Sequence, residues 1–282
     1  MQYSNTARES FERFLADDNE ENGAKPTAAG TLMRCSDAGN CLRQRGFAAA
    51  KFPEAHSFDT STLIAFSLGT SMHELLQESI GHVHGGEFEK VVDLSPLGVS
   101  LSGSSDGVVE VDGQTRLLEI KTCGAYPFRL AKETGLPKRQ HVAQAALYAM
   151  GTPEVTHLWM VYLAKESGFK GHKAGETIEW VIELDEELFD GFTPRQIAEQ
   201  ELDNFRSVQQ SLSEEMLPDA VVFDDDGVDM LVEKPPAYGS KGKPWNCCYC
   251  RYQSICEACG PTEVSLQTAK VHAGWLTEEE TV

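Results

Sequence analysis

Hydrophobic positions follow two different periods along the 282-residue chain, and together they predict a mixed α/β protein. Apolar residues three or four positions apart are typical of a helix with one buried face, whereas strict alternation or a short apolar run is typical of a strand. Helices are predicted at residues 5–17, 60–80, 137–151 and 194–210. Two or three strands are predicted between residues 86 and 123. Further strands are predicted from the apolar run at 155–165 and the alternating run at 176–184.

Capping signals predict where two of these helices begin. Thr193 and Pro194 suit the N-cap and the first helical position of the last predicted helix. Ser71 followed by Glu74 has the capping-box spacing, which predicts a helix start there and places His73 in a first helical turn.

One pair of predicted strands brings charged side chains together. Asp112-Gly113 between two β-rich runs is a strong signal for a two-residue hairpin turn, because both central positions need positive φ. Counting residue pairs outward from that turn places Asp106 opposite Glu119, with both carboxylates on one face. Side chains alternate along a strand, so Lys121 lies on the same face.

The predicted pairing of two carboxylates requires a compensating cation. Like charges directly opposite one another destabilise a sheet, and the cation is either Lys121 itself or a divalent metal. Close carboxylate oxygens suit Mg²⁺ or Mn²⁺, which prefer oxygen ligands. The simpler interpretation is an exposed strand face that carries an ordinary Glu-Lys pair.

Overall charge restricts how the chain can bind nucleic acid. The formal net charge is −20, and phosphate binding depends on Lys and Arg displacing counterions, so any DNA contact must be local. The chain has 41% hydrophobic residues, no apolar run long enough for a membrane span and no secretory signal pattern, so we expect a soluble cytoplasmic protein of a bacterium or a phage-infected cell. The residues available for a local basic surface are Lys132, Lys138, Arg139, Lys165, Lys170, Lys173, Lys241, Lys243 and Arg251.

Eight cysteines in a protein expected to be cytoplasmic indicate metal ligands or buried thiols more than disulfides. Cys247, Cys250 and Cys256 have a spacing that can gather three thiolates around one metal centre. The spacing alone does not distinguish zinc from an iron–sulfur cluster, and it supplies no fourth ligand. Cys123, just after Lys121, is expected to be a small buried hydrophobic residue.

Four motifs in order along the chain resemble the RecB-like branch of the PD-(D/E)XK nuclease superfamily. "SDG" and "LLEIKT" resemble the Asp and (Asp/Glu)-x-Lys core, "GTSMHELL" resembles the upstream His motif, and "QHVAQAALYA" resembles the downstream Gln-x-x-x-Tyr motif. "CLRQRGF" is similar to the segment that precedes the nuclease core in iron–sulfur members such as AddB and the CRISPR-associated RecB-like exonucleases. The resemblance implies a restriction-endonuclease-like α/β core, with a mixed central sheet flanked by helices. It also implies an iron–sulfur cysteine clip that joins the N- and C-terminal segments.

The same resemblance assigns roles to individual residues. It implies Asp106, Glu119 and Lys121 as catalytic residues, and His73, Asp106, Glu119 and the Ile120 carbonyl as ligands of Mg²⁺ or Mn²⁺. Cys41 becomes the favoured fourth ligand of a [4Fe–4S] cluster with Cys247, Cys250 and Cys256; zinc is the alternative metal, and Cys35, Cys248 and Cys259 are alternative ligands. The residues expected to bind DNA or support the site are Gln140, Gln144, Tyr148 and Lys165.

These assignments predict an enzyme with a single catalytic domain. We expect an N-terminal helix and linker at 1–34, a RecB-like nuclease domain closed by the cysteine cluster at 35–260, and a tail at 261–282. The expected function is a metal-dependent DNA exonuclease acting on ends or single strands in recombination, replication or repair, with a helicase or recombination protein as a compatible partner. The alternatives are a structure-specific or single-strand endonuclease, a nuclease that trims DNA for CRISPR adaptation, and a non-catalytic DNA-binding module with a zinc clip.

Overall fold

The computed structural model of the chain describes residues 10, 13–15, 17, 33–168, 171–189, 191–223, 229–242 and 244–276. Most of the helix expected at 5–17, its linker and the acidic residues 224–227 lie outside the described residues. Among the helices that are described, none is both long and apolar enough to cross a bilayer.

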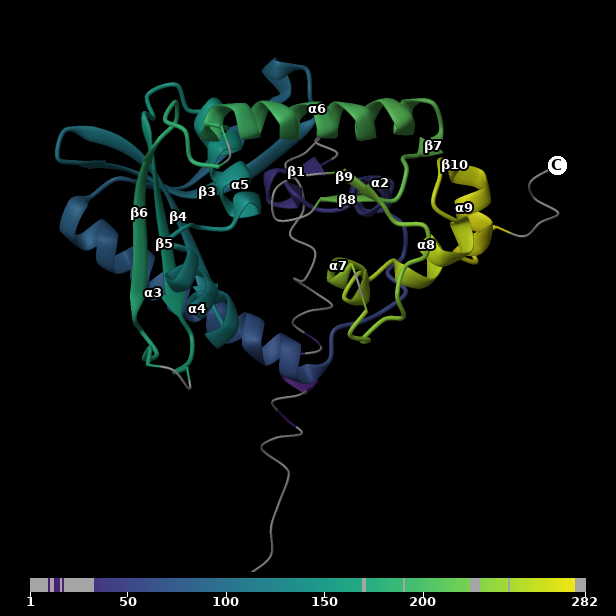
Figure 1. Ribbon diagram of the computed structural model, residues 1–282, viewed down its shortest axis with the longest axis horizontal. Helices are drawn as coiled ribbons and strands as arrows, with labels where there is room; N and C mark the ends of the chain where they lie inside the picture. The colour runs from purple at the N-terminus through teal and green to yellow at the C-terminus, as the bar shows by residue number, and fades with distance from the viewer. Residues whose placement is uncertain are drawn as a thin grey trace, which may run out of the picture.

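A six-stranded mixed sheet forms the centre of the fold, as the two hydrophobic periods predict (Figure 1). Its strands run in the order β1-β3-β4-β5-β6, and β2 pairs with β3 beside this path. The β4–β5 pair is parallel, which requires a crossover, and the intervening residues form two helices. The strands are β1 (Met33–Arg34), β2 (Glu87–Asp93), β3 (Leu101–Val111), β4 (Gln114–Cys123), β5 (His157–Ala164) and β6 (Thr177–Glu183).

The hairpin between β3 and β4 has the predicted turn and register. Asp112 and Gly113 both have positive φ, and Val111 pairs with Gln114. The antiparallel ladder continues from there to Gly107 opposite Leu118. The next pair of positions outward is Asp106 and Glu119, so the register brings the two acidic residues to neighbouring strands.

Helices cover both faces of the sheet and place polar residues near its centre. On one face, Leu118 and Ile120 of β4 pack with Ile80 of α3. On the other face, α5 and α6 enclose the main core, to which Val142 and Phe205 contribute fully buried side chains. The helices of this part are η1 (Cys35–Asp37), α2 (Leu42–Ala49), α3 (Thr60–His84), η2 (Ser95–Leu97), α4 (Ala125–Thr134), α5 (Arg139–Met150) and α6 (Pro194–Ser213).

The helix predicted at 60–80 is confirmed as α3, but the start predicted at Ser71 is wrong. The helix α3 begins at Thr60, and its N-cap is Asp59, whose Oδ1 accepts a hydrogen bond from the Thr62 amide at 2.8 Å. His73 therefore lies in the middle of a 25-residue helix instead of in a first turn. A local capping pattern was outweighed by the continuous helix packed along the sheet. By contrast, the N-cap predicted at Thr193 and the helix start predicted at Pro194 are confirmed for α6.

The C-terminal part of the chain packs against the segment that precedes α3. Phe47 of α2 stacks on Tyr252 with ring centroids 5.2 Å apart, within a small second core. The fully buried Arg43 side chain donates hydrogen bonds to the carbonyl groups of Pro218, Gly260, Pro261 and Thr262. The elements of this part are β7 (Met216–Leu217), β8 (Val221–Phe223), β9 (Asp229–Leu231), α7 (Trp245–Cys248), α8 (Gln253–Cys259), β10 (Val264–Ser265) and α9 (Leu266–His272).

Candidate active site and cysteine cavity

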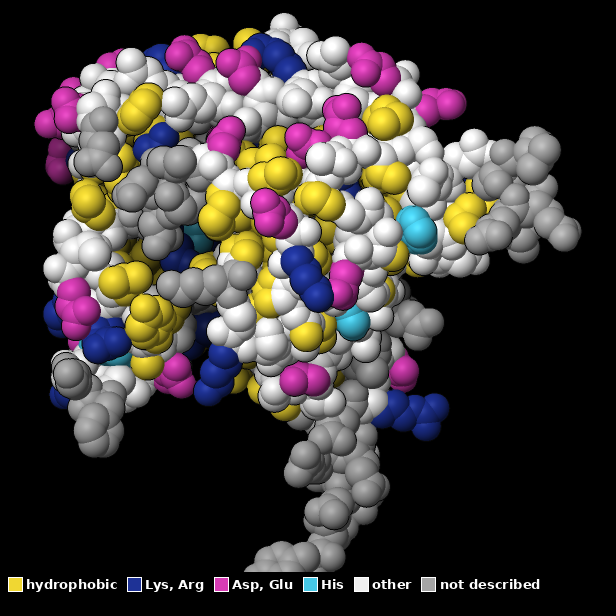
Figure 2. Space-filling model, turned by 45° about the vertical axis from the view of Figure 1, so that its right-hand side comes forward, with side chains coloured by type: hydrophobic (Ala, Val, Ile, Leu, Met, Phe, Trp, Pro, Cys, Tyr) yellow, Lys and Arg dark blue, Asp and Glu magenta, His cyan; other side chains and the backbone are white. Residues whose placement is uncertain are grey.

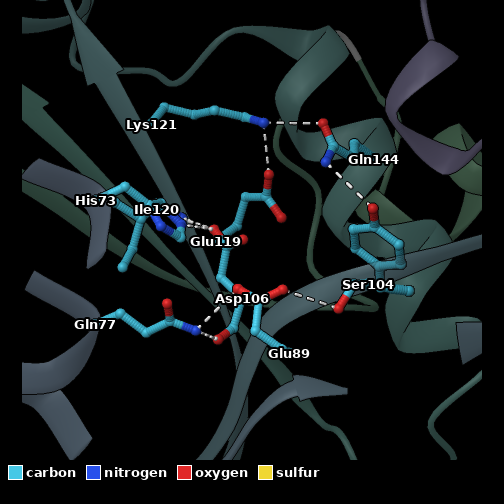
Figure 3. Close-up of polar contacts among 10 residues, drawn as sticks. His73, Gln77, Glu89, Ser104, Asp106, Glu119, Ile120, Lys121 and Gln144 are labelled. Atoms are coloured by element: carbon cyan, nitrogen blue, oxygen red, sulfur yellow. Dashed lines mark hydrogen bonds and ion pairs between the residues drawn. The ribbon is translucent and has the colours of Figure 1, made fainter. Parts of the chain in front are cut away.

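Side chains from α3, β3, β4 and α5 meet beside the central sheet (Figure 3). The structure brings together five residues singled out from the sequence: His73, Asp106, Glu119, Lys121 and Gln144. Each comes from a regular helix or strand, so the backbone of the core holds them in position.

Asp106 lies at a gap in the hydrogen-bonding ladders of β3. The register with β2 passes from Gly107 to Ser105, and the ladder with β4 ends at Gly107. The Asp106 carboxylate Oδ2 instead accepts from the backbone amide of Ile120 at 2.6 Å and lies 3.1 Å from His73 Nε2. The gap thus frees Asp106 from the regular sheet and fixes its carboxylate between β4 and α3.

Glu119 and Lys121 form a pair that continues into α5. The Lys121 ammonium lies 2.7 Å from Glu119 Oε1 and donates to Gln144 Oε1 at 2.9 Å. The Gln144 side-chain amide in turn donates to the Tyr148 hydroxyl at 3.4 Å. Gln144 and Tyr148, which were expected to support the site, therefore lie in one chain of contacts with the lysine.

Burial and neighbouring charges alter the acid–base properties of the site. The Glu119 side chain is only 1% exposed, and burial raises the pKa of its carboxyl to about 7, with Asp106 acting in the same direction. The hydrogen bond to Asp106 raises the pKa of His73. Burial disfavours the charged form of Lys121, but the Glu119 carboxylate outweighs it and the pKa of Lys121 is raised.

One feature of this site fits a cation. Glu119 Oε2 is buried and has no hydrogen-bond partner within the described structure, and a buried carboxylate oxygen without a partner is costly. Over the described residues, however, no three His, Cys, Asp or Glu side chains are already arranged as a complete metal site. The donor types suit a hard divalent ion, although His73 and the Ile120 amide at present occupy one oxygen of Asp106.

Three further polar residues at the site were not predicted from the sequence. Glu89 of β2 accepts hydrogen bonds from Ser104 at 3.1 Å and from Gln77 at 3.2 Å, and the Gln77 amide also donates to the Asp106 carbonyl at 2.7 Å (Figure 3). Glu89 has φ of 49°, a left-handed conformation that is uncommon for residues other than glycine. Gln77 lies one helical turn after His73, and this spacing is the sequence signal that could have identified it.

Two residues expected to contact DNA are engaged with the protein. The Gln140 side chain donates to Asn40 Oδ1 at 3.1 Å, so it packs against the segment before α2 instead of against Lys121. Lys165 Nζ donates to the Ala65 carbonyl at 3.2 Å, which ties the end of β5 to α3. Lys170 and Lys243 of the predicted basic surface lie outside the described residues.

Four cysteines from opposite ends of the domain line one small cavity. Cys41, which precedes α2, lines it together with Cys247, Cys250 and Cys256. Burial raises the pKa of the Cys247 thiol to about 12 and that of Cys250 to about 11, so these thiols are neutral without a cation. The cavity volume is about 20 Å³, and the side chains must turn before either a single metal ion or a larger cluster can be bound.

The remaining cysteines lie outside this cavity. Cys35 is fully buried in the main core, and the Cys248 thiol donates to the Gly242 carbonyl at 3.4 Å. Cys259 packs in the second core, outside the cavity lining. Cys123 is buried in the main core, which confirms its expected role as a small apolar residue.

Comparisons with known proteins place this geometry in a family. The sequence model of the PD-(D/E)XK nuclease superfamily matches residues 78–257, more than half of the chain. The matched region includes Asp106, Glu119 and Lys121 and begins after His73. A comparison with curated proteins finds no match.

Three solved structures are similar to the chain at low identity. The crystal structure of SSO0001 has 16% identity and a TM-score of 0.49, over 88% of this chain and 96% of the other. LHK-Exo in complex with dAMP has 16% identity and a TM-score of 0.45, over 66% and 89%. The alkaline exonuclease LHK-Exo from Laribacter hongkongensis has 13% identity and a TM-score of 0.40, over 76% and 84%. On the strength of the sequence match, the chain belongs to the PD-(D/E)XK nuclease superfamily.

Proposed function

We propose that this protein is a metal-dependent DNA exonuclease that hydrolyses phosphodiester bonds at ends or in single strands. The observation that carries the proposal is the buried Glu119 carboxylate, ion-paired with Lys121 through one oxygen and without a partner on the other. In a purely structural ion pair, both oxygens of the buried carboxylate would be expected to have hydrogen-bond partners. An incomplete pair beside Asp106 and His73 instead suits a site that awaits a cation and a phosphate.

The residues of the site would have two roles, metal binding and proton transfer. His73, Asp106, Glu119 and the Ile120 carbonyl would hold Mg²⁺ or Mn²⁺, which supplies Lewis-acid polarisation of the phosphate and a more acidic bound water. Asp106 is fixed by the Ile120 amide, so its second oxygen is the one free to face a ligand. His73 orients the same carboxylate from the α3 side.

Lys121 would act on the substrate side of the site. Its ammonium can orient a water for attack or stabilise the negative charge that develops on the phosphate. Gln144 fixes the ammonium through a 2.9 Å hydrogen bond, and α5 holds Gln144 in place. We therefore propose Lys121 as a catalytic residue and Gln144 as the residue that positions it.

The cysteine cavity would hold a [4Fe–4S] cluster, with zinc as the alternative. Four thiols line this one cavity, together with apolar residues and with Arg43, Gln44, Asn246 and Gln253. Thiolates suit a soft metal centre, and a bound cation would offset the cost of ionising them. Its role would be structural, since it would join Cys41 to the C-terminal cysteines across most of the chain. Visible absorbance of anaerobically purified protein, together with iron, sulfide and zinc analysis, distinguishes the two groups.

Digestion of labelled DNA tests the proposed activity. Linear single-stranded DNA labelled at either end and circular single-stranded DNA are incubated with Mn²⁺ or with EDTA. We expect stepwise shortening of the linear DNA with Mn²⁺, no cleavage in EDTA, and an intact circle. Cleavage of the circle would instead establish an endonuclease, and DNA binding without cleavage of any substrate would establish a non-catalytic module.

A further inference from the structure

Two large aromatic side chains are exposed at the start of the cysteine-bearing segment. Trp245 is 57% exposed and Tyr249 is 63% exposed, and their ring centroids lie 6.4 Å apart in an edge-to-face arrangement. Burial of rings of this size usually stabilises a fold, and exposed aromatic clusters are typical of binding surfaces. Neither ring belongs to a hydrophobic core of the described structure.

A lysine from the nuclease core lies over one of these rings. Lys138 Nζ is 5.4 Å from the centre of the Trp245 ring, within the range of a cation–π contact. Lys138 and Trp245 line a common cavity of about 650 Å³, between α5, α6, β9 and the segment leading into α7. The Trp245 ring and the Lys138 ammonium thus lie on the same wall of the cavity.

Lys138 also lies near two lysines of the proposed active-site region, close to Cys123 at the end of β4. Lys121, Lys138 and Lys165 all lie close enough to Cys123 to lower the pKa of its thiol, although burial raises that pKa overall. Three lysines around one position are notable in a chain with a net charge of −20. The face in Figure 2 has a hollow with Lys and Arg side chains in its depth and hydrophobic side chains at its rim.

Acidic residues lie on the opposite wall and are mostly paired. Glu201 forms an ion pair with Arg45 at 2.8 Å, and Asp203 forms one with Arg206 at 2.6 Å. The wall formed by α5 and α7 therefore has the more favourable potential for phosphate groups.

The helix α5 connects the aromatic ring to the catalytic centre. Lys138 is its N-cap, and Gln144, the partner of Lys121, follows six positions later. At 1.5 Å rise per residue the two positions are about 9 Å apart along the helix axis. A strand whose backbone contacts Lys138 can thus reach Lys121 within a few nucleotides.

We propose that Trp245 stacks on an unpaired base of single-stranded DNA whose backbone contacts Lys138, and that this contact guides the strand along α5 to the active site. The inference rests on the proposed nuclease function, and it specifies single-stranded DNA as the species bound next to the centre. A paired base in a duplex has both faces covered by its neighbours, so stacking on Trp245 selects an unpaired base. Tyr249 supplies the adjoining aromatic surface.

Binding of two oligonucleotides in EDTA tests the stacking contact apart from cleavage. One is oligo-dT and the other has the same sugar–phosphate backbone without bases, so that their ratio of Kd values isolates the contribution of the bases. We expect Trp245→Ala to weaken binding of oligo-dT by roughly 5- to 100-fold and leave the abasic strand nearly unchanged. Trp245→Phe should retain most of the preference, and Lys138→Gln should weaken binding of both strands.

Matched variants and a cleavage assay separate the possible failures. Lys270→Gln on α9 and Trp275→Phe just after α9 serve as controls. Thermal unfolding and metal content are measured for every variant. Unchanged preference for oligo-dT in Trp245→Ala would overturn the stacking proposal, while Mn²⁺-dependent cleavage by that variant would leave the nuclease function intact. If the wild type neither binds nor cleaves single-stranded DNA, the proposed function itself fails, and the stacking proposal fails with it.

Discussion

The proposed catalytic centre and the cysteine cavity are built in different ways. The proposed catalytic residues lie on long elements, and direct contacts of 2.6 to 3.1 Å join His73 to Asp106, Asp106 to Ile120, and Lys121 to Glu119 and Gln144. The cysteines lie before α2 or in and between α7 and α8, which have four and seven residues. Their thiols share a cavity without forming a complete metal site among the described residues.

This difference indicates which site depends on its bound group for order. The central sheet positions the proposed catalytic residues without help from a cation, so removal of a bound metal should affect chemistry more than folding. The helices α7 and α8 are short, so a group bound by the cysteines should contribute directly to stability. Arg43 is the protein's own link between the same two segments, through its hydrogen bonds to four carbonyl groups.

The largest expected effect is on catalysis by Lys121→Ala. We expect cleavage to fall at least 1,000-fold, about 4 kcal/mol of transition-state stabilisation, because the variant loses the only ammonium seen paired with Glu119 in the described structure. Single-turnover cleavage with Mn²⁺ and DNA binding in EDTA are measured on the same preparations. Lys270→Gln is the matched control, and wild-type rates in Lys121→Ala would contradict the assignment.

The next effect is loss of stability when the cysteine site is broken. Cys250→Ser should remove the bound group and lower the melting temperature by about 10 °C, equivalent to several kcal/mol for a domain of this size. Cys248→Ser is the control, since Cys248 does not line the cavity. Equal melting temperatures for wild type purified with its bound group and for Cys250→Ser would show that the cavity holds nothing structural.

Arg43→Met tests the protein's own link between these segments. The variant leaves the carbonyl groups of Pro218, Gly260 and Thr262 without their donor, which should cost about 3 kcal/mol in the free energy of unfolding. Denaturant unfolding measures the loss, and Arg129→Met on the exposed surface of α4 provides the comparison. A loss below about 1 kcal/mol, in the range of surface substitutions, would mean that the link is dispensable.

A pH-dependent effect of opposite sign is expected from Glu119→Gln in EDTA. Burial raises the folded-state pKa of Glu119 from 4.5 to about 7, so between these pH values the unfolded chain loses its proton first and the wild type loses stability. The variant lacks this titration. Its stability relative to wild type should therefore increase by roughly 3 kcal/mol from pH 4.5 to pH 8 and stay nearly constant above pH 8. A difference independent of pH would show that Glu119 titrates normally in the folded protein.

The sequence predicted the regular parts of the site better than its irregular parts. The Asp112-Gly113 turn determines the register of the hairpin, and the helical spacing of Gln144 and Tyr148 determines which face of α5 they share. The gap in the ladder at Asp106 and the positive φ of Glu89 depend on tertiary contacts with Gln77, which no short-range pattern encodes. The start predicted at Ser71 is wrong because α3 begins after the Asp59 N-cap and continues through Ser71.

The cysteines illustrate the same limit over a longer range. Their spacing identified the three C-terminal thiols, but nothing local to those residues identified Cys41. It comes to the cavity because α2 packs against the C-terminal segment, through Arg43 and the Phe47–Tyr252 stack. The fully buried position of Cys35 in the main core likewise depends on the whole fold.

Binding of Mn²⁺ to the catalytic centre is the most direct test of the central claim. Free Mn²⁺ is measured by electron paramagnetic resonance during titration of wild type, Asp106→Asn, Glu119→Gln and the Lys270→Gln control, each with the same content of the cysteine-bound group. We predict a site in wild type and the control that is lost or at least ten-fold weaker in both acidic variants, in parallel with their loss of cleavage. Undiminished Mn²⁺ affinity in Asp106→Asn and Glu119→Gln would contradict the account.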